Sequence, residues 1–225
     1  MTTIGLLALQ GDVPEHAAAL RRLLAPEALT AVRRPADLER VGGLVLPGGE
    51  STTLARLLRE TGLFDPLARR IAGGLPVFAT CAGLILVAEN LSAGSGTPDP
   101  ETLGGLGITV RRNGYGGQAE SFEAPVRVPE IGPESFPGVF VRAPRILAVT
   151  APVRPIAFRG EEVVGVARGS LFGFTFHPEL GADPRLHAAW VASFAPELLR
   201  GKSPAATPVP PKGRRRPVPR TPARR

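Results

Sequence analysis

The chain has 225 residues, of which 43% are hydrophobic and 21% charged, as is typical of a globular protein with a sizeable core. Its single cysteine excludes an intramolecular disulfide framework. The net charge is +7, but residues 201–225 hold eight Lys or Arg and no acid, which leaves residues 1–200 close to neutral. The basic balance therefore does not predict a nucleic-acid-binding core.

Strands and helices are expected to alternate over the first 90 residues. Apolar runs predict strands at 4–9, 31–33, 43–46 and 77–80, and amphipathic spacing predicts helices at 16–24, 52–60, 66–72 and from residue 84. This order predicts an α/β fold, a three-layer α/β/α arrangement around a doubly wound, mostly parallel sheet. The first apolar run is too short for a signal segment or a membrane span, so we expect a cytoplasmic protein without membrane contact.

The second half of the chain is richer in strands. A Gly-, Pro- and Ser-rich loop is expected at 90–107, and a final helix at about 184–199. Closely spaced strands are predicted at 108–111, 121–128, 138–141, 146–149, 156–159, 163–168 and 171–176. We expect them to add antiparallel strands at the edge of the sheet.

Residues 1–200 are predicted to form one domain and residues 201–225 a disordered tail. The tail holds seven prolines and no large apolar residue beyond two valines, too little to offset its ordering entropy. It is either a solvated appendage or a segment that touches nucleic acid or an acidic partner weakly.

Three polar segments follow predicted strands: PGGES at 47–51, TCAG at 80–83 and FHPE at 176–179. Ligands of open α/β sheets bind outside the carboxyl ends of the strands. The three segments, although far apart in sequence, are therefore expected to meet at one edge of the sheet.

Cys81 has two interpretations, a buried small hydrophobe or a nucleophile. Small neighbours at Ala79 and Gly83 would permit the sharp strand-to-helix turn that exposes a nucleophile. A helix N-terminus there would favour the thiolate, and the amide after the cysteine would donate to an oxyanion.

His177 and Glu179 are candidate partners for Cys81. Imidazole can serve as base and acid, and a carboxylate two residues on in an extended segment lies on the same side and can orient the ring. For His177 considered without Cys81, the alternative role is that of a structural histidine at the end of a strand. His187, in the final helix, favours a structural role, and His16 stays ambiguous.

The Pro47–Ser51 turn offers a second candidate site. Its glycines can bring backbone amides close to a ligand, while Ser51 can cap the following helix, and the two roles are compatible. Neither a dinucleotide pattern nor a Walker pattern is present, so we expect no cofactor, and we expect no metal.

The segments LALQGDVPEH, LVLPGGESTTL, PVFATCAGLILVAE, VRRNGYGGQ, VFVRAP and FTFHPEL follow one another between Ile4 and about Phe194. Together they resemble the glutaminase subunits of pyridoxal 5′-phosphate synthase, within the class I, triad-type glutamine amidotransferases. Many amidotransferases share the cysteine turn, and the combination of LQG, PGGES, Arg-Asn and HPE is narrower. The resemblance implies the class I glutamine amidotransferase fold, L-glutamine as substrate and a synthase subunit that accepts the ammonia.

The resemblance also implies roles for individual residues. Cys81 would be the nucleophile, His177 the base and acid, and Glu179 the residue that orients the ring. The implied glutamine-binding residues are Gly49, Glu50, Ser51, Arg112, Val141 and Arg142. The implied oxyanion hole consists of the amides of Gly48, Gly49 and Ala82. We extrapolate that Gln10 and Gly11, at a strand end, lie at the synthase interface.

Three positions depart from the family pattern. Ala79 replaces a frequent glycine, Gly117 a usual arginine and Gly181 a usual threonine. None of them is a triad member. The replacement at Gly117 is expected to weaken a loop contact or a partner contact. Two alternatives remain open at this stage: another glutamine amidotransferase or γ-glutamyl hydrolase, and a non-catalytic interaction module with an unreactive Cys81.

Overall fold

The computed structural model describes residues 2–92, 98–115 and 121–200. Its central sheet has seven strands in the order β10-β11-β12-β4-β3-β1-β2. They are β1 (Ile4–Leu7), β2 (Leu29–Val32), β3 (Gly43–Leu46), β4 (Val77–Thr80), β10 (Arg154–Arg159), β11 (Glu162–Arg168) and β12 (Leu171–Phe174). Neighbours from β2 across to β12 run parallel, whereas β11 is antiparallel to both β12 and β10. The predicted doubly wound, mostly parallel sheet with antiparallel edge strands is confirmed.

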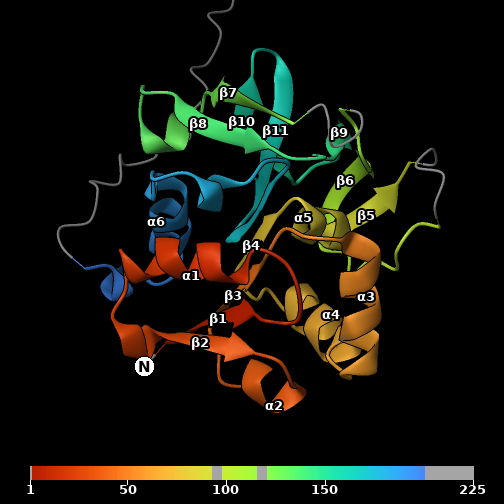
Figure 1. Cartoon of the computed structure of the whole chain (residues 1–225), viewed down its shortest axis with the longest axis vertical. Coiled ribbons are helices and arrows are strands. Elements are labelled where there is room, and N and C mark those ends of the chain that lie inside the picture. The colour runs from red at the N-terminus through yellow and green to blue at the C-terminus, as the bar shows by residue number, and fades with distance from the viewer. Residues whose placement is uncertain (1, 93–97, 116–120, 201–225) are drawn as a thin grey trace, which may run out of the picture.

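Helices cover both faces of this sheet, so the three-layer prediction is also confirmed (Figure 1). The helices are α1 (Val13–Arg21), α2 (Pro35–Leu38), α3 (Ser51–Glu60), α4 (Phe64–Ala72), α5 (Ala82–Val87) and α6 (Arg185–Ala192). Short 3₁₀ turns are η1 (Pro26–Ala28), η3 (Pro129–Ile131), η4 (Pro178–Leu180) and η5 (Pro196–Leu198). In Figure 1, α1 and α6 lie to the left of the sheet and α3, α4 and α5 to its right.

The two cores follow from the alternation of side chains along the strands. Leu6 and Phe78 pack with α1 and α6 on one face, while Leu7 and Ala79 pack with α3, α4 and α5 on the other. Successive strand residues point to opposite faces, and here both faces are covered. This is why the central strands are continuous apolar runs in the sequence.

The remaining strands form two separate small sheets, which corrects the expectation that all of them extend the main sheet. One contains β5 (Ala88–Leu91), β6 (Leu106–Arg111) and β9 (Arg145–Val149), and the other contains β7 (Phe122–Val126) and β8 (Phe136–Phe140). Only β10 and β11 are antiparallel additions to the main sheet. Strand-like patterns do not specify the pairing partner, since pairing depends on tertiary packing.

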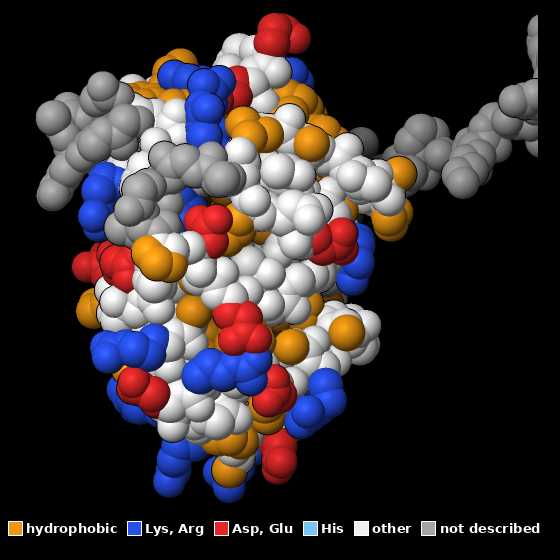
Figure 2. All heavy atoms as spheres, turned by 90° about the vertical axis from the view of Figure 1, so that its right-hand side faces the viewer, with side chains coloured by type: hydrophobic (Ala, Val, Ile, Leu, Met, Phe, Trp, Pro, Cys, Tyr) orange, Lys and Arg blue, Asp and Glu red, His pale blue; other side chains and the backbone are white. Residues whose placement is uncertain are grey.

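Charged side chains of both signs are intermingled over the face that carries α3 and α4 (Figure 2). Arg59 binds Asp65 at 2.6 Å, and Arg56 lies 3.7 Å from Glu60. This face therefore presents no large area of a single sign. Among the described residues, no helix combines the length and apolar character needed to cross a membrane.

Candidate active site

Cys81 and His177 lie at the ends of neighbouring strands. Cys81 directly follows β4 and His177 follows β12, and these strands pair in parallel with Phe174 opposite Thr80. The Cys81 amide donates to the Phe174 carbonyl at 2.9 Å. The expected meeting of distant segments at one sheet edge is therefore observed for this pair.

Cys81 occupies a sharp turn between β4 and α5. Its backbone has φ 46° and ψ −101°, a conformation that L side chains rarely adopt and that costs energy. Gly83 makes the turn possible, because a Cβ there would lie 2.2 Å from the Leu46 carbonyl oxygen. Cys81 is only 6% exposed, and its Sγ lies 4.0 Å from the Val141 carbonyl oxygen. This is the strained strand-to-helix geometry of a nucleophile elbow.

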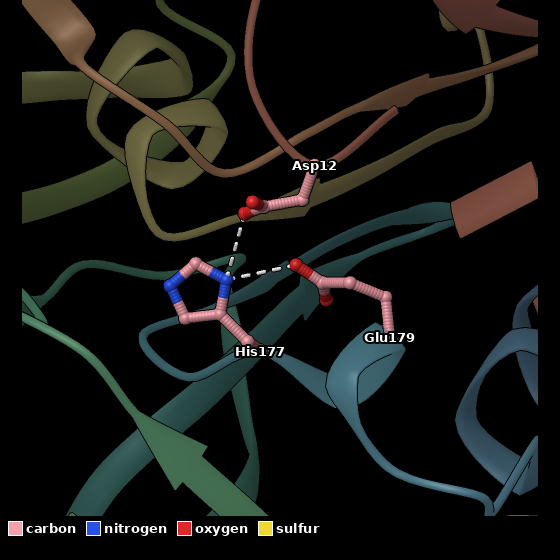
Figure 3. Close-up of side chains that lie close together, drawn as sticks. All are labelled: Asp12, His177 and Glu179. Carbon is pink, nitrogen blue, oxygen red and sulfur yellow. Dashed lines mark hydrogen bonds and ion pairs between the residues drawn. The ribbon is translucent and has the colours of Figure 1, made fainter. Parts of the chain in front are cut away.

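The His177 ring is held by two carboxylates. Its Nδ1 lies 2.8 Å from Glu179 Oε1 and 3.1 Å from Asp12 Oδ2, as Figure 3 shows. The His177 amide donates to the Val139 carbonyl at 2.8 Å, which ties the segment to β8. The sequence analysis missed Asp12, although its position just after β1, at the same sheet edge, is a signal that could have found it.

The electrostatic surroundings favour a charged His177 ring. Burial lowers the pKa of His177, but electrostatic interactions with Asp12, Cys81 and Glu179 outweigh it, and the net pKa is raised. Burial raises the pKa of Glu179, and the bond to His177 opposes that rise. His177 Nε2 is buried without a hydrogen-bond partner in the described part of the chain, so it is not engaged by Asp12 or Glu179.

Asp12, His177 and Glu179 also group closely enough to be considered as ligands of a metal ion, with atoms within 4.8 Å of one another. Both carboxylates, however, approach the same ring nitrogen, Nδ1. A ring nitrogen that donates to a carboxylate carries a proton and has no lone pair for a metal. The arrangement fits an oriented, charged imidazole better than a metal site.

A pocket of about 570 Å³ opens in front of Cys81 and His177. Its walls include all six predicted glutamine-binding residues: Gly49, Glu50, Ser51, Arg112, Val141 and Arg142. Asp12 lines the same pocket. The structure thus brings the predicted substrate residues to a cavity that Cys81 and His177 also line, and Glu179 contacts the His177 ring from outside the cavity.

Glu50, and not Ser51, caps helix α3, which corrects the expected cap. The Glu50 carboxylate accepts the amides of Thr52 at 3.2 Å and Thr53 at 2.6 Å. Burial raises the pKa of Glu50, but these bonds outweigh burial and lower it. A glutamate reaches N2 and N3 because its longer side chain can fold back over the first turn. Ser51 is instead the first residue of α3 and is buried.

Arg112 is buried at the end of β6 and is fixed by several partners. Its guanidinium donates to the Pro98 carbonyl at 3.0 Å and to Thr52 Oγ1 at 3.2 Å. It also lies 3.6 Å from carboxylate oxygens of Glu50 and Asp99. The loop expected at 90–107 therefore contributes directly to the site, which the sequence analysis did not anticipate.

The glycine turn packs against both His177 and the segment after β1. A Cβ on Gly48 would lie 2.4 Å from His177 Cε1, and Gly49 has φ +145°. Gln10 Oε1 accepts the Glu50 amide at 3.0 Å, and Gly11 lies against the Gly48 carbonyl. Gln10 and Gly11 therefore support this turn from behind. The third predicted oxyanion donor, Ala82, is the first residue of α5 and is buried.

The remaining predicted positions lie after β8, after η4 and outside the described residues. Val141 and Arg142 follow β8, and Arg142 has φ 43°. Gly181 has space for a larger residue, because an added Cβ would meet its nearest atom at 3.9 Å. Gly117 and the tail at 201–225 lie outside the described residues.

Residues 6–196 match the model of a known family, described as the SNO glutamine amidotransferase family. The chain belongs to this family. A relative in Pyrococcus furiosus, named pyridoxal 5′-phosphate synthase subunit PdxT, is 45% identical over 192 residues, covering 83% of this chain and 96% of the relative. A relative of the same name in a Nocardioides species is 50% identical over 195 residues, covering 84% of this chain and 94% of the relative.

A solved structure supports the same assignment at the level of the fold. A crystal structure described as a glutamine amidotransferase superposes with a TM-score of 0.77 at 41% identity, covering 85% of this chain and 98% of the other. The fold that the family resemblance implied is therefore confirmed, together with the membership of this chain in the family.

Proposed function

We propose that this chain is the glutaminase subunit of a pyridoxal 5′-phosphate synthase, hydrolysing L-glutamine to glutamate and passing the ammonia to a synthase subunit. The observation that carries the chemistry is Cys81 on its strained turn, one strand away from His177, at the opening of the pocket. Family membership and the shared name of the relatives in two distant organisms support the biological role.

The reaction begins with attack on the side-chain amide of glutamine. The Cys81 thiolate adds to the amide carbon, and the carbonyl oxygen takes up the negative charge. The amides of Gly48, Gly49 and Ala82 are the proposed donors to this oxygen, and preorganised donors of this kind stabilise such an intermediate strongly. The positive φ of Gly49 is one that a larger residue would adopt only with strain.

Ammonia leaves when His177 Nε2 gives its proton to the amide nitrogen and the carbon–nitrogen bond breaks. A thioester between Cys81 and the glutamyl group remains. Water then adds to the thioester carbon, with its proton passing to His177, and release of the thiolate yields glutamate. Glu179 and Asp12 hold Nδ1 at 2.8 and 3.1 Å, so Nδ1 keeps its proton while Nε2 gives up one proton and takes up another.

Recognition of glutamine requires an acid for its amino group and a base for its carboxylate. Glu50 is the proposed partner of the amino group, and Arg142, exposed at the pocket wall, the proposed partner of the carboxylate. Arg112 is committed to Glu50, Thr52 and the 98–99 segment, so we propose that it fixes the acid as well as facing the substrate.

The decisive experiment measures glutamine hydrolysis with and without the cognate synthase subunit, for the wild type and for Cys81→Ala. We expect the synthase to raise the wild-type rate and the variant to lose at least about 1000-fold in rate while forming no thioester. Leu147→Ala is a matched control, because Leu147 is 47% exposed and does not line the pocket.

Two outcomes would contradict the proposal. Retained glutaminase activity in a folded Cys81→Ala variant would exclude the triad. Full activity that the synthase leaves unchanged would exclude ammonia transfer as the role. Hydrolysis of γ-glutamyl peptides in preference to glutamine would favour a γ-glutamyl hydrolase instead.

A further inference from the structure

Two buried histidines that the proposed reaction does not use lie directly behind Glu179. His16 on α1 and His187 on α6 are both fully inaccessible to solvent. His16 Nε2 lies 3.1 Å from Thr80 Oγ1 and 3.4 Å from Glu179 Oε1. His16 Nδ1 lies 3.1 Å from His187 Nε2. A continuous polar chain therefore runs from the triad carboxylate to the far helix of that layer.

The hydrogen-bond network assigns one consistent set of protons to this chain. The Thr80 hydroxyl gives its one proton to Glu179 Oε1, so it accepts from His16, whose proton therefore lies on Nε2. His16 Nδ1 is then an acceptor, and His187 donates to it from Nε2. The remaining His187 Nδ1, which lacks a partner in the described part of the chain, is then an acceptor rather than an orphaned donor.

Both rings are expected to be neutral, as this assignment requires. Burial lowers the pKa of His16 well below its usual value, and the charges of His187 and His177 lower it further. Burial lowers the pKa of His187 to about 3. The other neighbour of both rings is Phe78, whose ring is stacked on His187 at 4.6 Å and meets His16 edge-on.

We propose that His16, held by His187, is a positioning residue that orients the Thr80 hydroxyl toward Glu179 Oε1 and so fixes the carboxylate in line with His177. This inference rests on the proposed function. Glu179 Oε1 then accepts from His177 Nδ1 at 2.8 Å and from Thr80 Oγ1 at 3.5 Å, and His16 Nε2 lies 3.4 Å from the same oxygen. Glu179 Oε2 has no partner in the described part of the chain, so Oε1 alone fixes the orientation of the carboxylate.

Removal of the His16 donor has a definite electrostatic consequence. Glu179 is buried, and loss of a donor makes its ionised form costlier. A less ionised Glu179 stabilises the charged His177 ring less, and a less charged ring stabilises the Cys81 thiolate less. The Cys81 thiolate and the charged His177 ring should therefore coexist over a narrower pH range. If His16 contributed only to packing, its removal would leave that pH range unchanged.

The test compares His16→Asn with His16→Gln in the full chain. The glutamine amide nitrogen can occupy the place of Nε2 and keep the donor, whereas asparagine reaches only the place of Nδ1. Alkylation of Cys81 by iodoacetamide against pH needs neither glutamine nor the synthase, and the chain has no other cysteine. In His16→Asn we expect the alkylation profile to move up by about one pH unit and the glutaminase rate to fall up to about 100-fold. We expect His16→Gln to restore most of both.

An unchanged alkylation profile in folded His16→Asn would overturn the inference, whatever the outcome of the glutaminase assay. Nitrogen-15 spectra of the wild-type histidines decide the matter even if the variants fail to fold. They should show His16 neutral, with its proton on Nε2, from pH 5.5 to 9. A charged His16, or a proton on Nδ1, would equally overturn the inference. Absent glutaminase activity with a shifted profile would reject the proposed function alone.

Discussion

At the scale of single residues, the main feature of the site is that two carboxylates approach the same nitrogen of the His177 ring. His177 Nδ1 faces both Glu179 and Asp12, of which Glu179 is fully buried and Asp12 is 30% exposed. Burial raises the pKa of Glu179, and the bond to His177 opposes that rise. Both carboxylates raise the pKa of His177, Glu179 from within the core and Asp12 from the pocket wall.

Asp12→Asn should shift the alkaline limit of glutaminase activity downward. The raised pKa of His177 keeps its ring protonated to higher pH, and removal of one negative charge lowers that pKa. Activity that needs the ring proton is then lost at a pH about one unit lower. The measurement is kcat/KM for glutamine against pH with the synthase present. Glu15→Gln, an equal charge change on α1, is the control and should leave the limit in place.

How much of the site the sequence could predict depends on the kind of contact. Cys81, His177 and Glu179 follow strands, and the rule for open α/β sheets was enough to bring them together. Asp12 and His16 act through contacts with segments more than 160 residues away, and no local pattern encodes such contacts. His16 stayed ambiguous for that reason.

At the scale of elements, the close approach of α5 to β3 sets the position of the nucleophile. The apolar runs on both sides of Cys81 made β4 and α5 recognisable, and β3 and β4 were predicted with their observed limits. The short α2 and the strand β5 were not predicted. Four-residue elements carry too little periodicity to be distinguished from a loop or from the end of a helix.

Gly83→Ala should destabilise the protein and impair the nucleophile together. The added Cβ would lie 2.2 Å from the Leu46 carbonyl oxygen, so α5 must move away from β3. We expect a loss of about 1–3 kcal/mol in the free energy of unfolding, measured with urea, and a lower alkylation rate of Cys81. Gly181→Ala is the control, since it has space for the methyl group and should change stability by less than about 0.5 kcal/mol. Equal stability of the two variants would contradict this packing argument.

At the scale of the whole molecule, the excess of basic residues lies in residues 201–225. Residues 1–200 are nearly neutral, and the face over α3 and α4 mixes both signs, as Figure 2 shows. The family match ends at residue 196, so the basic segment at 201–225 lies beyond it. We propose that this segment takes no part in glutamine hydrolysis.

Deletion of residues 201–225 should leave kcat, KM and the melting temperature unchanged. The segment has seven prolines and little apolar surface, so it has nothing to contribute to a core. Kinetics with the synthase and thermal melts of the full and shortened chains make the comparison. A lower melting temperature on deletion would show that the tail packs on the domain. Salt-sensitive binding of DNA by the full chain alone would assign the tail a role of its own.

The register between β4 and β12 has a consequence for how such enzymes diverge. Cys81 and His177, the proposed nucleophile and base, follow two hydrogen-bonded strands, whereas the pocket walls come from α3, the end of β6 and the segment after β8. The spacing of a sheet ladder is the same whatever side chains surround it. During evolution the residues of the pocket walls can therefore change, and with them the amide substrate or the synthase partner. The relative position of Cys81 and His177 is kept.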